Sequence, residues 1–406
     1  MSQGKFIIRQ QALPRMMTRI AAVRETSPSA TVSGFVLSIG FGLTGAGTVM
    51  LGVLLPTLSQ AWRLHDDVAG FLFFLQFSGS ALGAVFTSAH RVHSLMRGYS
   101  LLVLSACALA FAGPGMAFPL FFCWGLGLGM TMTATSLLFS DRWSDDRAAK
   151  LEALNFAWAA GAATAPMLFL PFLITAQIRL LFFTFLALFL VLFAWVFFRE
   201  RQIVPLARGD GLQSRAAPSP ARLLPLLILA MSSVGVEASL SGWLTTYSHR
   251  AAPHGIARAA LATSLFWLGV VLSRLAFSTP LMAKLGRYSA LKSTMWGLAA
   301  AVALLILTRD PTLILVASWL SGLCLGPIYP LLLSFLLERS ARGWIFAVAG
   351  TGSAIVPWLT GLLSARFGSL RFGLLAPCAA VLLMLLLRSL AVRQAPPSSP
   401  PAPSCL

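Results

Sequence analysis

The chemistry available to this chain centres on one glutamate and one arginine inside apolar segments. Glu237, in "SSVGVEASLSGWLTTYS" (232–248), is the one acidic residue that falls deep in such a segment, and Arg274 is its basic counterpart. A charge at the middle of a bilayer costs ~3 kcal/mol on insertion scales, so such residues pair, face a cavity or stay neutral. We expect Glu237 and Arg274 to form a charge pair or to alternate as partners. The pair serves either a transport site or only the assembly of the helices.

A polar stripe extends from Glu237 along its segment. Ser233, Glu237, Ser241 and Thr245 follow one another at steps of four residues, and Ser248 adds a step of three. Gly235 and Gly242 lie on the opposite side of a helix with this sequence. Glycines allow close approach of a neighbouring helix. The pattern therefore predicts a helix that turns its polar stripe toward a cavity and packs through its small residues.

Four other side chains could contact a solute or take part in coupling. Trp267 precedes Arg274 by seven residues and shares its helical face. Gln76 either lines a cavity or bonds to a neighbouring helix. Asn155 lies at the start of an apolar run, where a hydrogen bond between loop and helix is favoured over ligand binding. Tyr329 stands between two prolines, which allows a role in gating or plain packing.

The composition places these residues in a membrane protein. The 406 residues are 57% hydrophobic and only 10% charged, whereas a soluble domain carries about 25% charged residues. The net charge of +18 sits in short connections and on no soluble segment, so nucleic acid is not the expected partner. No phosphate-binding loop, metal-ligand cluster or catalytic triad is present in the sequence. We expect no cofactor, no metal and no enzymatic activity.

Runs of about 20 apolar residues, the length that crosses a bilayer, recur along the chain and predict an all-α polytopic protein with twelve transmembrane helices. Basic residues gather in the connections on the side of the N-terminus, which predicts cytoplasmic termini in a bacterial-type inner membrane. The spans are expected near residues 33–55, 68–89, 97–116, 117–139, 153–173, 179–198, 223–247, 259–282, 288–307, 312–337, 343–363 and 370–389.

A polar stretch rich in Arg, Pro, Gly and Ser divides the spans into two sets of six. The expected organisation is a cytoplasmic tail (1–31), a six-helix bundle (32–198), a cytoplasmic linker (199–222), a second six-helix bundle (223–389) and a disordered cytoplasmic tail (390–406).

Short fragments of the two bundles match in the same order. "NFAWAAGAATAP" (155–166) resembles "IFAVAGTGSAIVP" (345–357), "GSALGAV" from Gly79 aligns with "GVVLSRLA" from Gly269, and "GLGLG" (125–129) aligns with "GLCLG" (322–326). Repeats of this kind place a binding site between the two halves, near the bilayer midplane.

Twelve spans in two repeated sets, with a central loop and both ends on one side, resemble the major facilitator superfamily. The segments "SVGVEASLSGWLTTY", "SLFWLGVVLSRLA" and "GLCLGPIYPLLLSFL" are similar to its fucose-permease-like branch, which draws Trp243 into the candidate site. That branch's pairing of acids in the first and fourth spans is missing. The first span has no acid, and Met132 stands at the matching position of the fourth.

The resemblance implies a secondary transporter that works by alternating access. It moves a small polar solute such as a sugar, with proton symport as the coupling and Glu237 as the protonation site. Since a sugar site usually offers several amides and acids, efflux of amphipathic or hydrophobic compounds is the first alternative. A membrane sensor or scaffold that has lost transport is the second. The expected partners are the solute, protons and the lipid bilayer.

Overall fold

The structure is a computed structural model of the chain, and it describes residues 28–88, 90–143, 147–199, 220–251, 255–277, 286–339 and 344–393. Within these ranges every regular element is a helix. The expected linker and C-terminal tail lie almost entirely outside the described residues, and so does most of the expected N-terminal tail.

Twelve spans of the described residues are long and apolar enough to cross a bilayer, as predicted. Three of them are each built from two helices, so the helices outnumber the spans. The first half contains α2 (Pro28–Trp62), α3 (Asp66–Val85), α4 (Arg91–Leu109), α5 (Pro114–Arg142), α6 (Arg147–Leu168), α7 (Leu170–Ile174) and α8 (Ile178–Arg199). The second half contains α9 (Pro220–Ala251), α10 (Ile256–Phe277), α12 (Arg287–Leu307), α13 (Pro311–Leu325), α14 (Ile328–Arg339), α15 (Trp344–Phe367), α16 (Leu370–Gly373) and α17 (Leu375–Arg393).

Several predicted boundaries are wrong by six or seven residues. The first span was expected to end at residue 55, but α2 continues to Trp62, and the third was expected to begin at residue 97, but α4 begins at Arg91. The third span was expected to reach residue 116, but α4 ends at Leu109 and α5 already begins at Pro114. Proline is favoured at the first position of a helix, because its missing N–H group has no intrahelical partner there in any case. Pro114 therefore starts the fourth span earlier than hydropathy alone indicates.

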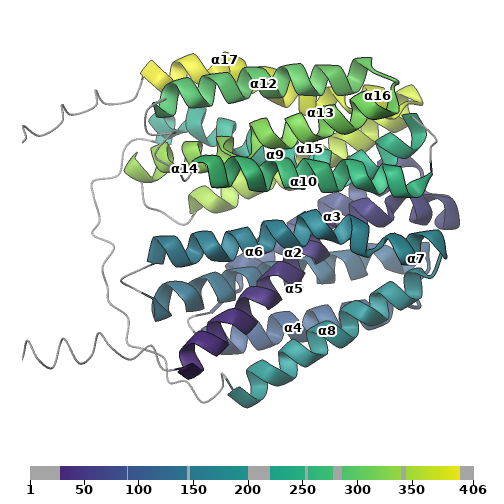
Figure 1. Cartoon of the computed structure of the whole chain (residues 1–406), viewed down its shortest axis with the longest axis vertical. Coiled ribbons are helices and arrows are strands. Elements are labelled where there is room, and N and C mark those ends of the chain that lie inside the picture. Colours follow the sequence, from purple (N-terminus) through teal and green to yellow (C-terminus); the bar gives the residue numbers. More distant parts are fainter. Residues whose placement is uncertain are drawn as a thin grey trace, which may run out of the picture.

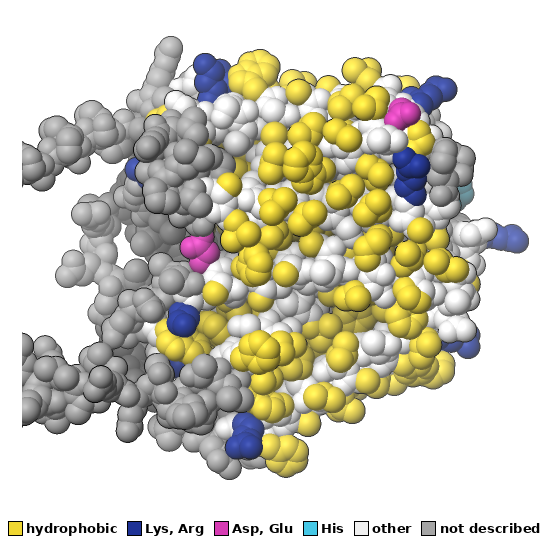
Figure 2. All heavy atoms as spheres, in the orientation of Figure 1, with side chains coloured by type: hydrophobic (Ala, Val, Ile, Leu, Met, Phe, Trp, Pro, Cys, Tyr) yellow, Lys and Arg dark blue, Asp and Glu magenta, His cyan; other side chains and the backbone are white. Residues whose placement is uncertain are grey.

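The helices form two bundles, one from each half of the chain (Figure 1). Within the halves, α3 packs on α5 and α2 on α6, as α10 packs on α13 and α9 on α15. Between the halves, α3 contacts α15, α6 contacts α10, and α2 contacts α9. Hydrophobic side chains cover the middle of the face shown in Figure 2, and Lys and Arg lie toward its two ends, as a bilayer requires.

Glycines set the spacing between helices in each bundle. A Cβ on Gly125 of α5 would collide with the backbone carbonyl of Gln76 in α3, and one on Gly322 of α13 would collide with the carbonyl of Phe266 in α10. The two collisions are equivalent, because these glycines occupy matching positions of "GLGLG" and "GLCLG". Only a residue without a side chain permits this approach.

A second pair of glycines repeats the relation. Gly161 of α6 lies against the carbonyl of Gly42 in α2, and Gly352 of α15 lies against the carbonyl of Met231 in α9. These glycines come from the other matched fragments of the two halves. The internal repeat seen in the sequence is therefore a repeat of backbone contacts, which gives both bundles the same frame.

We predict that Gly125→Ala lowers stability by about 1–3 kcal/mol, since an added methyl group in a close-packed interior forces the backbones apart. The matched control is Gly350→Ala in α15, where an added Cβ meets nothing within 4 Å. That change is expected to be neutral or to stabilise by roughly 0.5–1 kcal/mol, because alanine favours helix. Thermal unfolding in detergent measures both, and equal melting temperatures for the two variants would contradict the packing argument.

Candidate functional site

Glu237 and Arg274 lie in contact. Glu237 projects from the middle of α9 and Arg274 from the last turn of α10, and Nη2 of the arginine lies 3.3 Å from Oε2 of the glutamate. Their side chains are 21% and 27% exposed, so both charges are largely removed from solvent. An isolated charge in such a place is costly, and a partner of opposite sign offsets part of that cost.

Arg274 also holds the break between α13 and α14. Its Nε donates to the carbonyl oxygen of Gly326 at 3.3 Å. In an unbroken helix that oxygen would accept from the N–H of residue 330, but Pro330 has no N–H group. The proline thus frees a carbonyl within the membrane region, where every backbone polar group needs a partner. Arg274 supplies the partner and links α9, α10 and the tenth span.

Tyr329 lies at the same break, at the start of α14. Its phenol is partly buried and lies within electrostatic reach of both Glu237 and Arg274. We define the charge site as Glu237, Arg274, Tyr329 and the carbonyl of Gly326. The sequence indicated the three side chains as candidates, and the structure brings them together. It also adds the carbonyl oxygen, which no side-chain pattern could have indicated.

The polar stripe of α9 serves helix packing, so the expectation that it lines a cavity is wrong for its second half. Ser241 accepts a hydrogen bond from Trp267 Nε1 at 2.9 Å, and the hydroxyls of Thr245 and Thr263 lie 2.8 Å apart. All four groups are buried. The stripe faces α10 because these hydroxyls satisfy one another there, where water is excluded. Of Glu237, Ser241 and Thr245, only Glu237 is partly exposed.

Tryptophans mark the contact between the halves. The ring of Trp267 meets Trp158 of α6 edge to face, with centroids 5.1 Å apart. Trp243 donates to the carbonyl of Pro357 within the second half, and its ring lies 5.6 Å from Phe73 of α3. The sequence singled out Trp243 and Trp267, but it gave no sign of Trp158 or Phe73, which come from distant segments.

Neither Gln76 nor Asn155 forms a hydrogen bond to the described residues of the charge site. Gln76 is buried, and its Nε2 donates to the carbonyl of Thr48 in α2 at 2.9 Å. Of the two roles expected for Gln76, this is the bond to a neighbouring helix. Asn155 is exposed on α6, and its side chain forms no hydrogen bond to a described residue. The loop-to-helix bond expected for Asn155 is therefore missing among the described residues.

A second charged group, which the sequence did not indicate, joins the halves at their ends. Asp66 begins α3, and its two oxygens accept from Nη1 and Nη2 of Arg250, the penultimate residue of α9, each at 2.7 Å. Ser364 of α15 donates to the same carboxylate at 2.5 Å. We call Asp66, Arg250 and Ser364 the end latch. Its members lie at helix ends, where charged residues are usual, and no spacing in the sequence relates them.

The halves are close together at the latch and less so farther along α9. Leu224, Met231 and Gly242 share one face of α9, at steps of seven and eleven residues. Gly242 is buried against the ring of Phe73 from the first half. Leu224 is 55% exposed and Met231 is partly exposed on the same face. On this face the first half covers the latch end of α9 and leaves the other end exposed, whereas Glu237 lies on the opposite side of the helix, toward α10.

Comparisons with known proteins agree with this arrangement. The family model described as Major Facilitator Superfamily matches residues 37–342. Among solved structures, a bacterial homolog of the human lysosomal transporter Spinster, in an inward-facing and occupied conformation, has a TM-score of 0.68 at 14% identity, over 91% of this chain and 98% of that one.

Two other solved transporters are similar at the same level. The peptide transporter POT, in complex with sulfate, has a TM-score of 0.70 at 15% identity, over 89% of this chain and 94% of that one. The nucleoside transporter NupG has a TM-score of 0.69 at 13% identity, over 89% of this chain and all of that one (100%). A search of curated proteins gives no match.

We predict that Arg274→Gln destabilises the protein by about 1–3 kcal/mol, since it leaves Glu237 partly buried without its cation. Adding Glu237→Gln should recover more than half of that loss, because no buried charge then lacks a partner. Thermal unfolding of the two single variants and the double variant gives the coupling energy. Arg309→Gln, an exposed change near the end of α12, is the control. Strictly additive losses would show that the two charges do not stabilise each other.

Proposed function

The chain belongs to the major facilitator superfamily and is a multi-pass membrane transporter, and from this membership we propose that it is a proton-coupled secondary transporter of a small solute. The two bundles move against each other by alternating access, and Glu237 takes up and releases the coupling proton. The observation that carries the proposal is the contact of Glu237 with Arg274 between α9 and α10, where both side chains are largely removed from solvent.

Protonation of Glu237 has a direct structural consequence in this arrangement. A neutral carboxyl group loses most of its attraction for the guanidinium of Arg274. Arg274 then keeps only the carbonyl of Gly326, which belongs to the interrupted tenth span. The balance of forces between α9, α10 and this span changes with one proton. A proton on Glu237 thus acts on α9, α10 and the tenth span together.

The end latch supplies the second element of alternating access. It is an ion pair between the halves, and it lies far along the helices from the charge site. If the termini are cytoplasmic in a bacterial-type inner membrane, the latch closes the outer end and this conformation opens inward. Opening to the outside then requires that Asp66 part from Arg250 and Ser364.

The resemblance to the fucose-permease-like branch favours a small polar solute such as a sugar, carried by proton symport. A specific observation favours a second candidate, efflux of amphipathic or hydrophobic compounds. The hydroxyls of Ser241, Thr245 and Thr263 are already bonded to helix neighbours. These hydroxyls are therefore already engaged, and large aromatic rings such as Trp158 lie at the contact of the halves.

We predict that Glu237→Gln abolishes the pH dependence of transport. A solute panel screened for thermal stabilisation of the purified protein selects the solute, and proteoliposomes then report its flux with and without a proton gradient. In the native protein an inward proton gradient should raise uptake at least tenfold, or drive export when reversed. The variant should only equilibrate the solute. Glu152→Gln, an exposed change on α6, is the control, and a variant that still follows the gradient would refute the coupling role.

We predict that Asp66→Asn opens the latch end. An amide cannot hold Arg250 by charge, so the population with separated ends should rise. Spin labels at Arg63 and Arg366, introduced as cysteines in a cysteine-free background, measure this separation, and a longer-distance population should appear. Asp67→Asn is the matched control, because Asp67 forms no ion pair with a described residue. Identical distance distributions for the native protein and Asp66→Asn would show that the latch does not hold the halves.

A further inference from the structure

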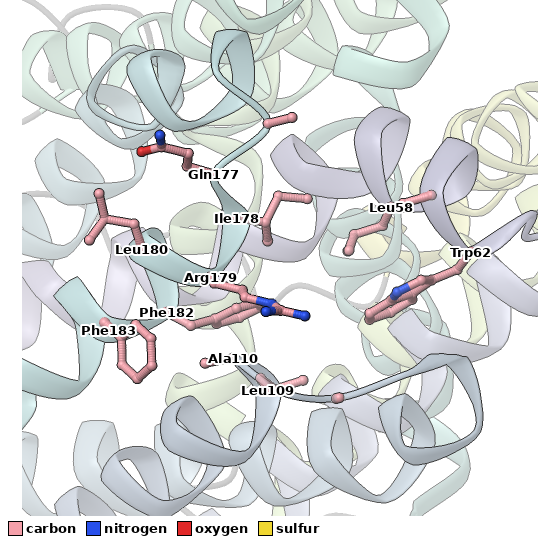
Figure 3. A pocket seen from close by; sticks show the side chains of 13 residues that line it. Leu58, Trp62, Leu109, Ala110, Gln177, Ile178, Arg179, Leu180, Phe182 and Phe183 are labelled. Carbon is pink, nitrogen blue, oxygen red and sulfur yellow. The ribbon is translucent and has the colours of Figure 1, made fainter.

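A cavity of about 600 Å³ lies within the first half, at the latch end of the bundle. The last turn of α2, the end of α4 and the first turns of α8 enclose it (Figure 3). All of its walls belong to one half, so it is separate from the seam between the bundles. It is lined by Leu58, Ala61, Trp62, Leu109, Ala110, Ala112, Ala176, Gln177, Ile178, Arg179, Leu180, Phe182 and Phe183.

The inner wall of the cavity is apolar. Leu58, Leu109, Ala110 and Phe182 are each at most 2% exposed, and none offers a polar side-chain atom. Toward the outside the wall is formed by Leu180, which is 49% exposed on the flank of the bundle. A cavity that is apolar inside and bordered by lipid-facing residues fits a hydrocarbon chain entering from the bilayer.

Arg179 gives the cavity a cationic head. It lies in the first turn of α8, and Figure 3 shows its side chain within the cavity, pointing toward Trp62. The residue is exposed, and it adds its charge to a helix N-terminus, which carries partial positive charge of its own. The first turn of α8 holds no acidic residue, and Arg179 forms no ion pair with a described residue. Both positive charges therefore lack an anion.

We propose that this cavity binds an anionic phospholipid from the leaflet at the latch end. One acyl chain lies against the apolar wall of Leu58, Leu109 and Phe182. The phosphate lies between the guanidinium of Arg179 and the free N–H groups that begin α8, which is the usual place for an anion at a helix. Trp62 ends its span beside the cavity, at the depth where tryptophans meet lipid head groups.

The lipid holds the ends of three helices of one half together. It is a resident of the first half and not the transported solute, because no residue of the second half lines the cavity. The site does not depend on proton coupling or on the identity of the solute. Loss of transport coupling in a variant of Glu237 would leave it unchanged.

The test adds dioleoyl phosphatidylglycerol or dioleoyl phosphatidylcholine to the full-length protein in a neutral detergent. Phosphatidylglycerol should raise the melting temperature by about 5 °C more than phosphatidylcholine, since a ligand that binds only the folded state stabilises it. Native mass spectrometry should show one retained phosphatidylglycerol. Arg179→Gln should reduce the shift to the phosphatidylcholine level, and Arg179→Lys should keep most of it.

Two further variants separate the site from general effects. Ala112→Phe places a bulky ring in the cavity and should reduce the shift while the charge of Arg179 remains. Arg309→Gln removes an exposed cation near the end of α12. In this variant phosphatidylglycerol should raise the melting temperature as much as in the native protein. Three results would overturn the proposal: equal shifts with both lipids, an undiminished shift in Arg179→Gln, or an equal shift with glycerol phosphate alone. The last result would indicate a site for a soluble anion.

Discussion

The contacts between α9, α10 and the tenth span in the second half depend on the two partners of Arg274. A guanidinium in the membrane region needs both an anion and a hydrogen-bond acceptor. Glu237 provides the first at 3.3 Å, and the Gly326 carbonyl, left free by Pro330, provides the second at 3.3 Å. One side chain thus joins two helices to the break in a third. Any change in the charge of Glu237 reaches the tenth span through a single residue.

The helices within each bundle are closely packed. Glycines such as Gly125 and Gly322 bring backbones together so closely that no side chain fits between them. Interiors packed in this way shift as units and do not deform gradually. The same contacts occur in both halves, so each half is a matched frame. In the proposed alternating access, movement would occur at the surfaces between the frames, where the latch and the tryptophans lie.

The hydrogen bonding of α9 bears on the kind of solute that the proposed transporter would accept. A helix with several hydroxyls suggests a polar cavity. The hydroxyls of Thr245 and Thr263 are instead bonded to each other, and that of Ser241 accepts from Trp267. A buried polar group that is already paired gains little from a ligand. Under the proposed function, recognition would therefore rest on the charge site and on aromatic surface, which is compatible with a small polar solute and with an amphipathic one.

The sequence by itself determined the class, the twelve spans and the repeat, because hydropathy, span length and glycine spacing are local properties that a bilayer turns into structure. It also identified Glu237 and Arg274, since a charge in an apolar run is conspicuous at any position. Only the tertiary structure decided that the stripe of α9 faces α10, and that Asp66 meets Arg250 across 184 residues. Periodicity tells which residues share a face. It does not tell what that face meets, because the neighbour comes from a distant part of the chain.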